Sequence, residues 1–151
     1  MQTDSPRPWG RENGFTLIEL MVVVLIIGIL IAIALPTFLG ARQRAQDKAA
    51  QSNLRNAIAA AKTFYTDGET YDGFEAVGVA VGIEPSLTWA LADGVAVVNT
   101  VTINETTATL IEMSSRSASG AFFCIRDAST GPGTTLGNVD ATGATACTGT
   151  W

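Results

Sequence analysis

The sequence predicts an α+β fold, with a long kinked N-terminal helix and a small head built on an antiparallel β-meander. Three observations predict it. An apolar run extends over 25 residues, from Phe15 to Leu39. It continues directly into an Ala-rich segment whose apolar residues recur at helical spacing. After Pro85, short segments rich in β-branched residues alternate with polar turns, which is typical of strands.

The apolar run is long enough to cross a membrane. As a helix it would extend about 37 Å, and a hydrocarbon core is about 30 Å thick. Residues 20–35 contain no polar side chain, so the helix would be apolar on every face, as in a membrane span or the centre of a bundle. The run is too long for an ordinary secretory signal, whereas a permanent single-pass anchor remains an alternative.

Three residues stand out within this run. A carboxylate in hydrocarbon is costly, so Glu19 is a functional candidate; alternatively, it lies close enough to the helix start to reach the lipid headgroups. Pro36 has no N–H group, so the carbonyl of Ala32 loses its helical partner and a kink is expected. Gly28 lowers helix propensity by about 1 kcal/mol relative to Ala. Gly and Pro are also frequent in membrane helices for no special reason.

The segment from Arg42 to Thr66 is expected to continue the helix in amphipathic form. The helix should end within residues 66–73, with Gly68 as its cap. Apolar residues at spacings of three and four form one stripe that should pack on the head: Ala50, Leu54, Ala57, Ile58, Ala61, Phe64 and Tyr65.

The remainder is expected to form about four antiparallel strands lying across the C-terminal half of the helix. Residues 74–83 fit either a short helix or a strand. Two strand-like segments flank Ala92-Asp93-Gly94, and Asp-Gly favours a hairpin between them. Residues 107–114 and 120–128 supply further strands. Residues 127–146 lack a clear period and are expected to form a loop.

Composition argues against an enzyme. The chain has no histidine, no motif pairing a nucleophile with a base and no cofactor fingerprint, so neither catalysis nor a cofactor is expected. The net charge of −5 is divided unevenly, with five bases and one acid in residues 42–62, and ten acids and two bases from Thr63 onward. The acidic balance argues against direct nucleic acid binding. It indicates either a solvated surface or complementarity between copies, the basic helix of one facing acidic surface of another.

The sequence also contains three weaker candidate sites. Asn104-Glu105-Thr106 is a glycosylation sequon that we do not expect to be used. Asp127 and Asp140 lack the ligand density of a calcium loop and are expected to be solvated, so no metal is predicted. Three aromatic residues are expected to pack in the core or at the edge of the head rather than to form an adhesive surface: Tyr71, Trp89 and Trp151.

The stretch G-FTLIE-LMVVVLIIGILIAIALP resembles the class III signal of type IV prepilins. A short polar leader ends in Gly14, Phe15 follows, and Glu19 stands in fifth place before the apolar run with its Gly28 and Pro36. The resemblance covers roughly residues 10–65. It implies that a prepilin peptidase cuts between Gly14 and Phe15 on the cytoplasmic side and methylates the new amino group.

The same resemblance implies two further roles within the helix. Glu19 would meet the positive N-terminus of a neighbouring subunit as a filament grows, which sets the register between otherwise apolar helices. The segment between Gly28 and Pro36 would bend or partly unwind when subunits leave the bilayer.

The tail, from AFFC to the C-terminus, is similar to the disulfide-bounded C-terminal region of type IV pilins. This implies a disulfide between Cys124 and Cys147 in an exported chain. Two free buried thiols are the alternative. The spacing of the two cysteines is not that of a zinc site.

The resemblance implies a structural subunit, the major pilin of a type IV pilus, held by one span in the cytoplasmic membrane and polymerised into an extracellular helical filament. Its partners would be copies of itself, the prepilin peptidase, the assembly platform protein and motor ATPases. The alternative is a pseudopilin of a type II secretion or DNA-uptake machine; a monomeric anchored binding domain is a third possibility. The expected parts are the cleaved leader (1–14), the membrane and filament-core helix (15–39), the amphipathic helix (40–66) and the β head (67–151).

Overall fold

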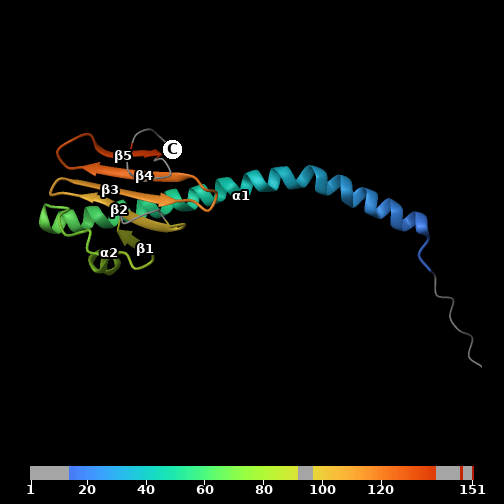
Figure 1. The fold of residues 1–151 in the computed structure, drawn as a ribbon, viewed down its shortest axis with the longest axis horizontal. Coiled ribbons are helices and arrows are strands. Elements are labelled where there is room, and N and C mark those ends of the chain that lie inside the picture. The colour runs from blue at the N-terminus through green and yellow to red at the C-terminus, as the bar shows by residue number, and fades with distance from the viewer. Residues whose placement is uncertain (1–13, 92–96, 139–146, 148–150) are drawn as a thin grey trace, which may run out of the picture. The chain divides into compact units, whose positions relative to one another are not determined.

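The computed structural model describes residues 14–91, 97–138, 147 and 151. Within them it contains a long helix, α1 (Leu17–Gly68), a short helix, α2 (Val77–Ile83), and a five-stranded sheet (Figure 1). The α+β prediction is confirmed. The chain divides into a first unit, Met1–Leu39, and a second unit, Gly40–Trp151, which are described separately.

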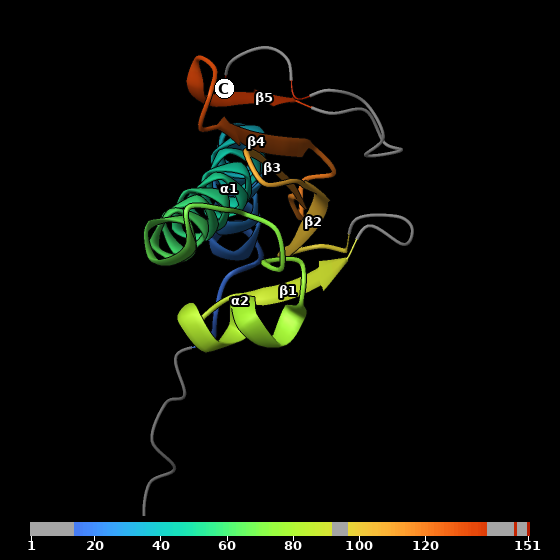
Figure 2. The same ribbon diagram turned by 90° about the vertical axis from the view of Figure 1, so that its left-hand side faces the viewer.

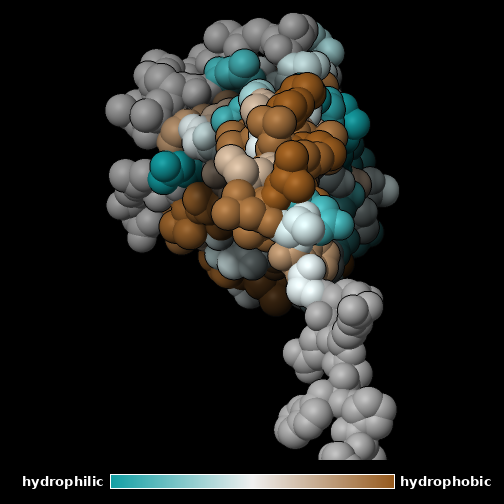
Figure 3. All heavy atoms as spheres, turned by 90° about the vertical axis from the view of Figure 1, so that its right-hand side faces the viewer, coloured by the Kyte–Doolittle hydropathy of each residue, from teal (hydrophilic) through white to brown (hydrophobic). Residues whose placement is uncertain are grey.

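The first unit is helical from Leu17 onward, and the helix continues through Pro36. Its large apolar side chains have no covering within the chain, since each of those between Leu17 and Leu39 is at least 48% exposed. Figure 3 shows these hydrophobic side chains gathered on the surface of the segment. By length and composition, α1 contains a stretch able to cross a membrane.

In the second unit, α1 lies along one face of the sheet (Figure 2). The predicted stripe is confirmed: Ala50, Leu54, Ala57, Ile58 and Ala61 are buried, and the rings of Phe64 and Tyr65 pack partly buried against the same core. Alternate residues of the strands supply the other side of this core, because successive side chains of a strand point to opposite faces: Val101, Ile103, Ile111, Met113, Phe123 and Ile125.

The end of α1 differs by one residue from the expected cap. Gly68 is the last helical residue, and Glu69 adopts the left-handed conformation with φ 53°. The Glu69 N–H donates to the Tyr65 carbonyl at 2.6 Å, the single bond of an αL cap. The Tyr71 ring then packs at a tilt against that of Tyr65, with centroids 4.7 Å apart.

The strands lie in the order in which the chain makes them, β1-β2-β3-β4-β5. From β2 onward each strand pairs antiparallel with the next, so a meander is present as predicted. A register shift interrupts the pairing of β2 with β3 between Ile103 and Glu105. The bounds are β1 Thr88–Leu91, β2 Thr100–Thr106, β3 Leu110–Arg116, β4 Phe122–Ala128 and β5 Gly133–Asn138.

The predicted hairpin between the first two strands is wrong. β1 pairs parallel with β2, with Thr88 opposite Thr100 and Leu91 opposite Ile103. A parallel partner requires the chain to return along β1 before β2 begins. Because β1 has only four residues, about 13 Å of strand, the connection from 92 to 99 is long enough for this return. The expected turn, Ala92-Asp93-Gly94, lies outside the described residues.

The loop predicted for residues 127–146 is also wrong in part. β5 forms within it and pairs with β4 from Ala128 opposite Gly133 to Phe123 opposite Asn138. Its Thr- and Gly-rich sequence carries no apolar alternation, so its pairing depends on backbone groups that the edge of β4 offers. Residues 139–146 lie outside the described part of the chain. The ambiguous segment 74–83 contains the helix α2, which lies beside β1 (Figure 2).

Candidate functional site

The N-terminus of α1 is closed by a reciprocal cap between Thr16 and Glu19. The Thr16 backbone N–H donates to Glu19 Oε2 at 2.9 Å, and the Thr16 hydroxyl donates to the same oxygen at 2.5 Å. In return, the Glu19 N–H donates to Thr16 Oγ1 at 3.3 Å. This is a capping box, which satisfies two of the N–H groups that a helix start leaves without partners. The Thr-x-x-Glu spacing was a sequence signal for it that our reading missed.

The cap gives the Glu19 carboxylate hydrogen bonds but no opposite charge. Among the described residues, the one ion pair joins Lys62 to Asp127, far along the chain. A carboxylate in the first turn is favoured by the helix dipole, which contributes a few tenths to about 1 kcal/mol. Among the residues that the structure describes, no cation forms an ion pair with Glu19.

Gly14 and Phe15 precede the helix and are open to approach. The Phe15 side chain is 83% exposed, and a Cβ placed on Gly14 would meet no atom within 4 Å. Gly14 and Phe15 thus directly precede α1, and Glu19 lies in its first turn. Gly28 and Pro36 lie further along the same helix, and a Cβ at Gly28 would also meet nothing. The kink at Pro36 stays a prediction.

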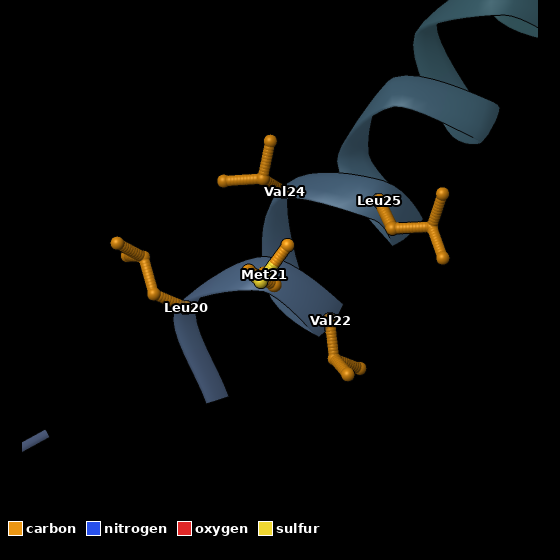
Figure 4. A pocket seen from close by; sticks show the side chains of 5 residues that line it. All are labelled: Leu20, Met21, Val22, Val24 and Leu25. Atoms are coloured by element: carbon orange, nitrogen blue, oxygen red, sulfur yellow. The ribbon is translucent and has the colours of Figure 1, made fainter. Parts of the chain in front are cut away.

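From Leu20 to Leu35 the helix presents only apolar side chains. Figure 4 shows five neighbouring side chains that point away from the helix in different directions. Burying a side chain of this kind fully contributes about 1.5–3 kcal/mol. The segment therefore gains most from surroundings that cover it on all sides, such as lipid or other helices. The five are Leu20, Met21, Val22, Val24 and Leu25.

In the second unit, Cys124 of β4 is joined to Cys147 by a disulfide, and both residues are buried. The Cys147 N–H donates to Glu112 Oε2 at 3.4 Å. At the C-terminus, the Trp151 indole N–H donates to the carbonyl of Gly137 at 2.7 Å. The C-terminal residues are therefore attached to strands β3, β4 and β5 by one covalent bond and several hydrogen bonds.

Asp127 is not the solvated loop acid that we predicted. It lies in β4, is 4% exposed, and forms an ion pair with Lys62 at 3.0 Å. It accepts hydrogen bonds from the hydroxyls of Tyr71 at 2.6 Å and Thr134 at 2.5 Å. Burial alone raises the pKa of Asp127, but these hydrogen bonds and the ion pair outweigh it and hold the pKa below its ordinary value. The second candidate acid, Asp140, lies outside the described residues.

The remaining sites have structural explanations. Tyr71 and Trp89 are core residues as predicted, at 1% and 7% exposure. The side-chain oxygen of Asn104 accepts a hydrogen bond from Ser114 at 3.0 Å, and its amide nitrogen is buried. Because glycosylation attacks through that nitrogen, the sequon is inaccessible in the folded chain. In the part of the chain that the structure describes, no three His, Cys, Asp or Glu side chains form a metal-binding group.

Comparison with known proteins identifies the N-terminal motif. The family described as "Prokaryotic N-terminal methylation motif" matches residues 9–35. The "Type IV major pilin protein PilA" of Myxococcus xanthus is 47% identical over 64 residues, which are 42% of this chain and 29% of that protein. The "Type IV wide pilus major component PilA4" of Thermus thermophilus is 37% identical over 74 residues, covering 49% of this chain and 56% of that protein.

Relatives from secretion machines also match. The "Type II secretion system core protein G" of Pectobacterium carotovorum is 32% identical over 65 residues, covering 43% of this chain and 42% of that protein. Across these three relatives, the aligned part spans between 29% and 56% of the relative's length. No solved structure matches the chain with significance. The chain thus carries the prokaryotic N-terminal methylation motif, and its resemblance to type IV pilins is confirmed.

Proposed function

We propose that this chain is the major structural subunit of a type IV pilus. The observation that carries the proposal is the apolar stretch from Leu20 to Leu35, exposed on every face and placed directly behind the methylation motif. Such a surface needs covering. Lipid of the cytoplasmic membrane covers it in the stored subunit, which crosses the membrane once, and the helices of other copies cover it in an extracellular helical filament.

Maturation begins at the junction of Gly14 and Phe15. A prepilin peptidase removes residues 1–14 on the cytoplasmic side and methylates the amino group of Phe15. The geometry supports this role, because the junction lies ahead of the helix and Gly14 presents no side chain to hinder the approach of a protease. The segment that follows becomes the filament core.

Glu19 meets the methylated amine of Phe15 of a neighbouring subunit during assembly. The cap uses Glu19 Oε2, whereas Oε1 accepts none of the hydrogen bonds found among the described residues. The carboxylate can therefore keep its cap and still accept from an ammonium. Two unit charges 4 Å apart attract by about 4 kcal/mol at an effective dielectric constant of 20. The other side chains of these helices are apolar and do not by themselves select one axial register. The attraction between the two charges would therefore favour one register over the others.

Further along the helix, the segment between Gly28 and Pro36 bends or partly unwinds as the subunit leaves the bilayer. Gly28 weakens the helix, and Pro36 removes one backbone hydrogen bond. Extraction and polymerisation would involve an assembly platform protein and motor ATPases, which act on the membrane-embedded subunit. The role of the chain in this process is structural.

A second candidate is a pseudopilin of a type II secretion machine, which the similarity to core protein G supports. Cleavage and methylation at the N-terminus would be the same in a pseudopilin as in a pilin, because both proteins have an apolar helix that needs to be covered. The two candidates differ in the product, a long surface filament or a short transport fibre.

Electron microscopy of the bacterium that makes this chain separates them. We expect surface filaments that label with antibody to this chain, disappear when it is deleted, and return with the wild type. A variant with Gly14→Val, which blocks the protease by bulk, should not restore them. Unchanged filaments in the deletion strain, together with a loss of protein secretion, would instead favour the pseudopilin.

A further inference from the structure

A polar groove runs beside α1 in the second unit. Arg44, Asp47 and Lys48 of the helix form one wall. Asn138 of β5 and the ring of Trp151 line the other side, with Phe123 also in the lining. The groove does not involve the N-terminal site, and the proposed maturation chemistry does not use it.

The groove is positively charged. Arg44, Lys48 and Arg55 recur at spacings that place them on one face of the helix. The Arg55 guanidinium carbon lies 5.4 Å from the centroid of the Trp151 ring, a cation–π contact beside the groove. The acid in the groove, Asp47, already accepts a hydrogen bond from Ser119.

The groove cations keep their charge available for an external partner. The Lys48 ammonium donates to the neutral side chain of Gln51 at 2.9 Å. Among the described residues, the one ion pair is that of Lys62 with Asp127, so none of them neutralises Arg44 or Lys48. The groove thus suits a ligand that carries carboxylates.

The same unit carries a complementary segment at the other end of its helix. Residues 66–73 contain three exposed acids, Asp67, Glu69 and Asp72, and no base. Lys48 and Asp67 both lie in α1 and are 19 residues apart, about 28 Å along the helix. The acidic segment therefore cannot enter the groove of its own chain.

We propose that the groove binds the acidic segment 66–73 of a second copy of this chain. The inference rests on the proposed function, which supplies many copies side by side, and it names a contact between them. Groove and segment are different patches, so each bound pair leaves one groove and one segment free. A heterologous contact of this kind repeats without closing when its rotation does not form a ring, as a filament requires. Opposite charges would contribute mainly to specificity and register.

Carbodiimide cross-linking of purified filaments tests the contact directly. The reagent joins an amine to a carboxylate without a spacer, so it would link Lys48 to Asp67, Glu69 or Asp72 only when two copies touch. We expect mass spectrometry of filaments grown from mixed light- and heavy-nitrogen chains to find this link between a light and a heavy peptide. The variant Lys48→Arg should lose the link while keeping normal filaments, because it retains the charge without the amine.

Charge reversal provides a second test of the contact between the groove and the acidic segment. Lys48→Glu combined with Arg44→Glu should lower filament yield at least fivefold, and adding Asp67→Lys and Glu69→Lys should recover much of the loss. The single variant Lys48→Glu should also lower the yield, and Arg42→Glu is its matched control: it makes the same change of charge on the same helix but does not line the groove, and yield should stay normal.

Failure of this inference is distinguishable from failure of the proposed function. Filaments that contain the chain but show no Lys48 link, and that form normally with Lys48→Glu and Arg44→Glu, overturn the groove contact and leave the pilus subunit standing. If the bacterium makes no filaments, the pilus proposal fails. The full-length chain in membrane vesicles then decides the contact: a Lys48 link between copies supports it, and the absence of one overturns it.

Discussion

At the start of α1, the Glu19 carboxylate is held by the backbone N–H and the hydroxyl of Thr16. Two separate effects can therefore make this residue important. One is the cap, whose loss typically costs a helix about 1 kcal/mol. The other is the negative charge that the assembly proposal requires. A substitution that removes only one of them tells the two apart.

The pair Glu19→Gln and Glu19→Val makes that separation. Gln preserves the capping hydrogen bonds but carries no charge. If charge is what assembly needs, both variants should insert into the membrane normally and both should lose most surface filaments. Quantitative immunoblotting of sheared filaments against membrane fractions measures this. Glu19→Asp, which keeps the charge with a shorter reach, should be milder than either.

A different outcome is informative about the cap. Normal filament yield with Glu19→Gln and a defect only with Glu19→Val would mean that Glu19 acts as a capping residue and not as a charge partner. Thr16→Val serves as the control for the reciprocal half of the cap, because it removes the hydroxyl and leaves Glu19 in place.

Asp127 should make the stability of the second unit depend on pH. Because its pKa is depressed in the folded chain, its stabilisation is present above the ordinary value near 4 and is lost as the pH falls through the lower folded value. Asp127→Asn should lower the free energy of unfolding at pH 7 by about 2 kcal/mol, since it weakens hydrogen bonds to a charged group. Denaturant unfolding of the full chain in detergent, from pH 7 to pH 2.5, measures both effects.

The wild-type and Asp127→Asn curves should converge toward the acid end of that range. The matched control, Asp72→Asn, removes an exposed acid and should change the free energy of unfolding by less than about 0.5 kcal/mol. Parallel curves for wild type and Asp127→Asn over the whole range would contradict this role for Asp127.

Among the elements, the disulfide ties the C-terminal residues to β4. A bridge that closes a loop of 23 residues contributes about 3 kcal/mol if restriction of the unfolded chain dominates. We expect Cys124→Ser and Cys147→Ser each to lower the free energy of unfolding by about that amount, and the double variant to be no worse than either single one. Denaturant unfolding in detergent, with and without reductant, is the measurement.

Cleavage at Gly14 provides the control for this prediction. In the proposed maturation the peptidase acts at the other end of the chain, so the serine variants should mature normally even where their abundance falls. Two alkylated cysteines in the unreduced wild-type protein would refute the bridge, and additive losses in the double variant would show that each thiol acts separately.

The elements also show where sequence reasoning succeeds. The apolar run and the stripe from Ala50 to Ala61 were predictable because helical periodicity over many residues is a strong signal. The motif around Gly14, Phe15 and Glu19 was predictable because several features coincide within a few positions. The capping box at Thr16 was also readable from its spacing.

Other features depend on partners distant in sequence. The parallel pairing of β1 is set by where β2 lies, and a local Asp-Gly signal cannot report that. β5 has little apolar pattern because it packs one apolar side chain, Leu136, against the core and otherwise pairs with β4 through its backbone. Asp127 looked like a loop acid because its partners, Lys62 and Tyr71, are 65 and 56 residues away.

At the scale of the whole molecule, the chain joins two units that differ in whether their apolar side chains are exposed or buried. The first unit exposes an apolar surface that nothing within the described chain covers. The second unit buries its own core and carries a basic groove and an acidic segment at opposite ends of its helix. The exposed apolar surface favours a cover, and the proposed filament supplies both a cover for the helix and a neighbour for the groove.

The proposed pilus subunit is processed at Gly14 and built into a surface filament. Intact mass spectrometry of protein released by shearing filaments from the cell surface tests both parts at once. We expect one species comprising Phe15–Trp151 with a single added methyl group and one intact disulfide. A sheared filament fraction without this chain, or one in which the chain still begins at Met1 or is cut after the apolar run, would contradict it.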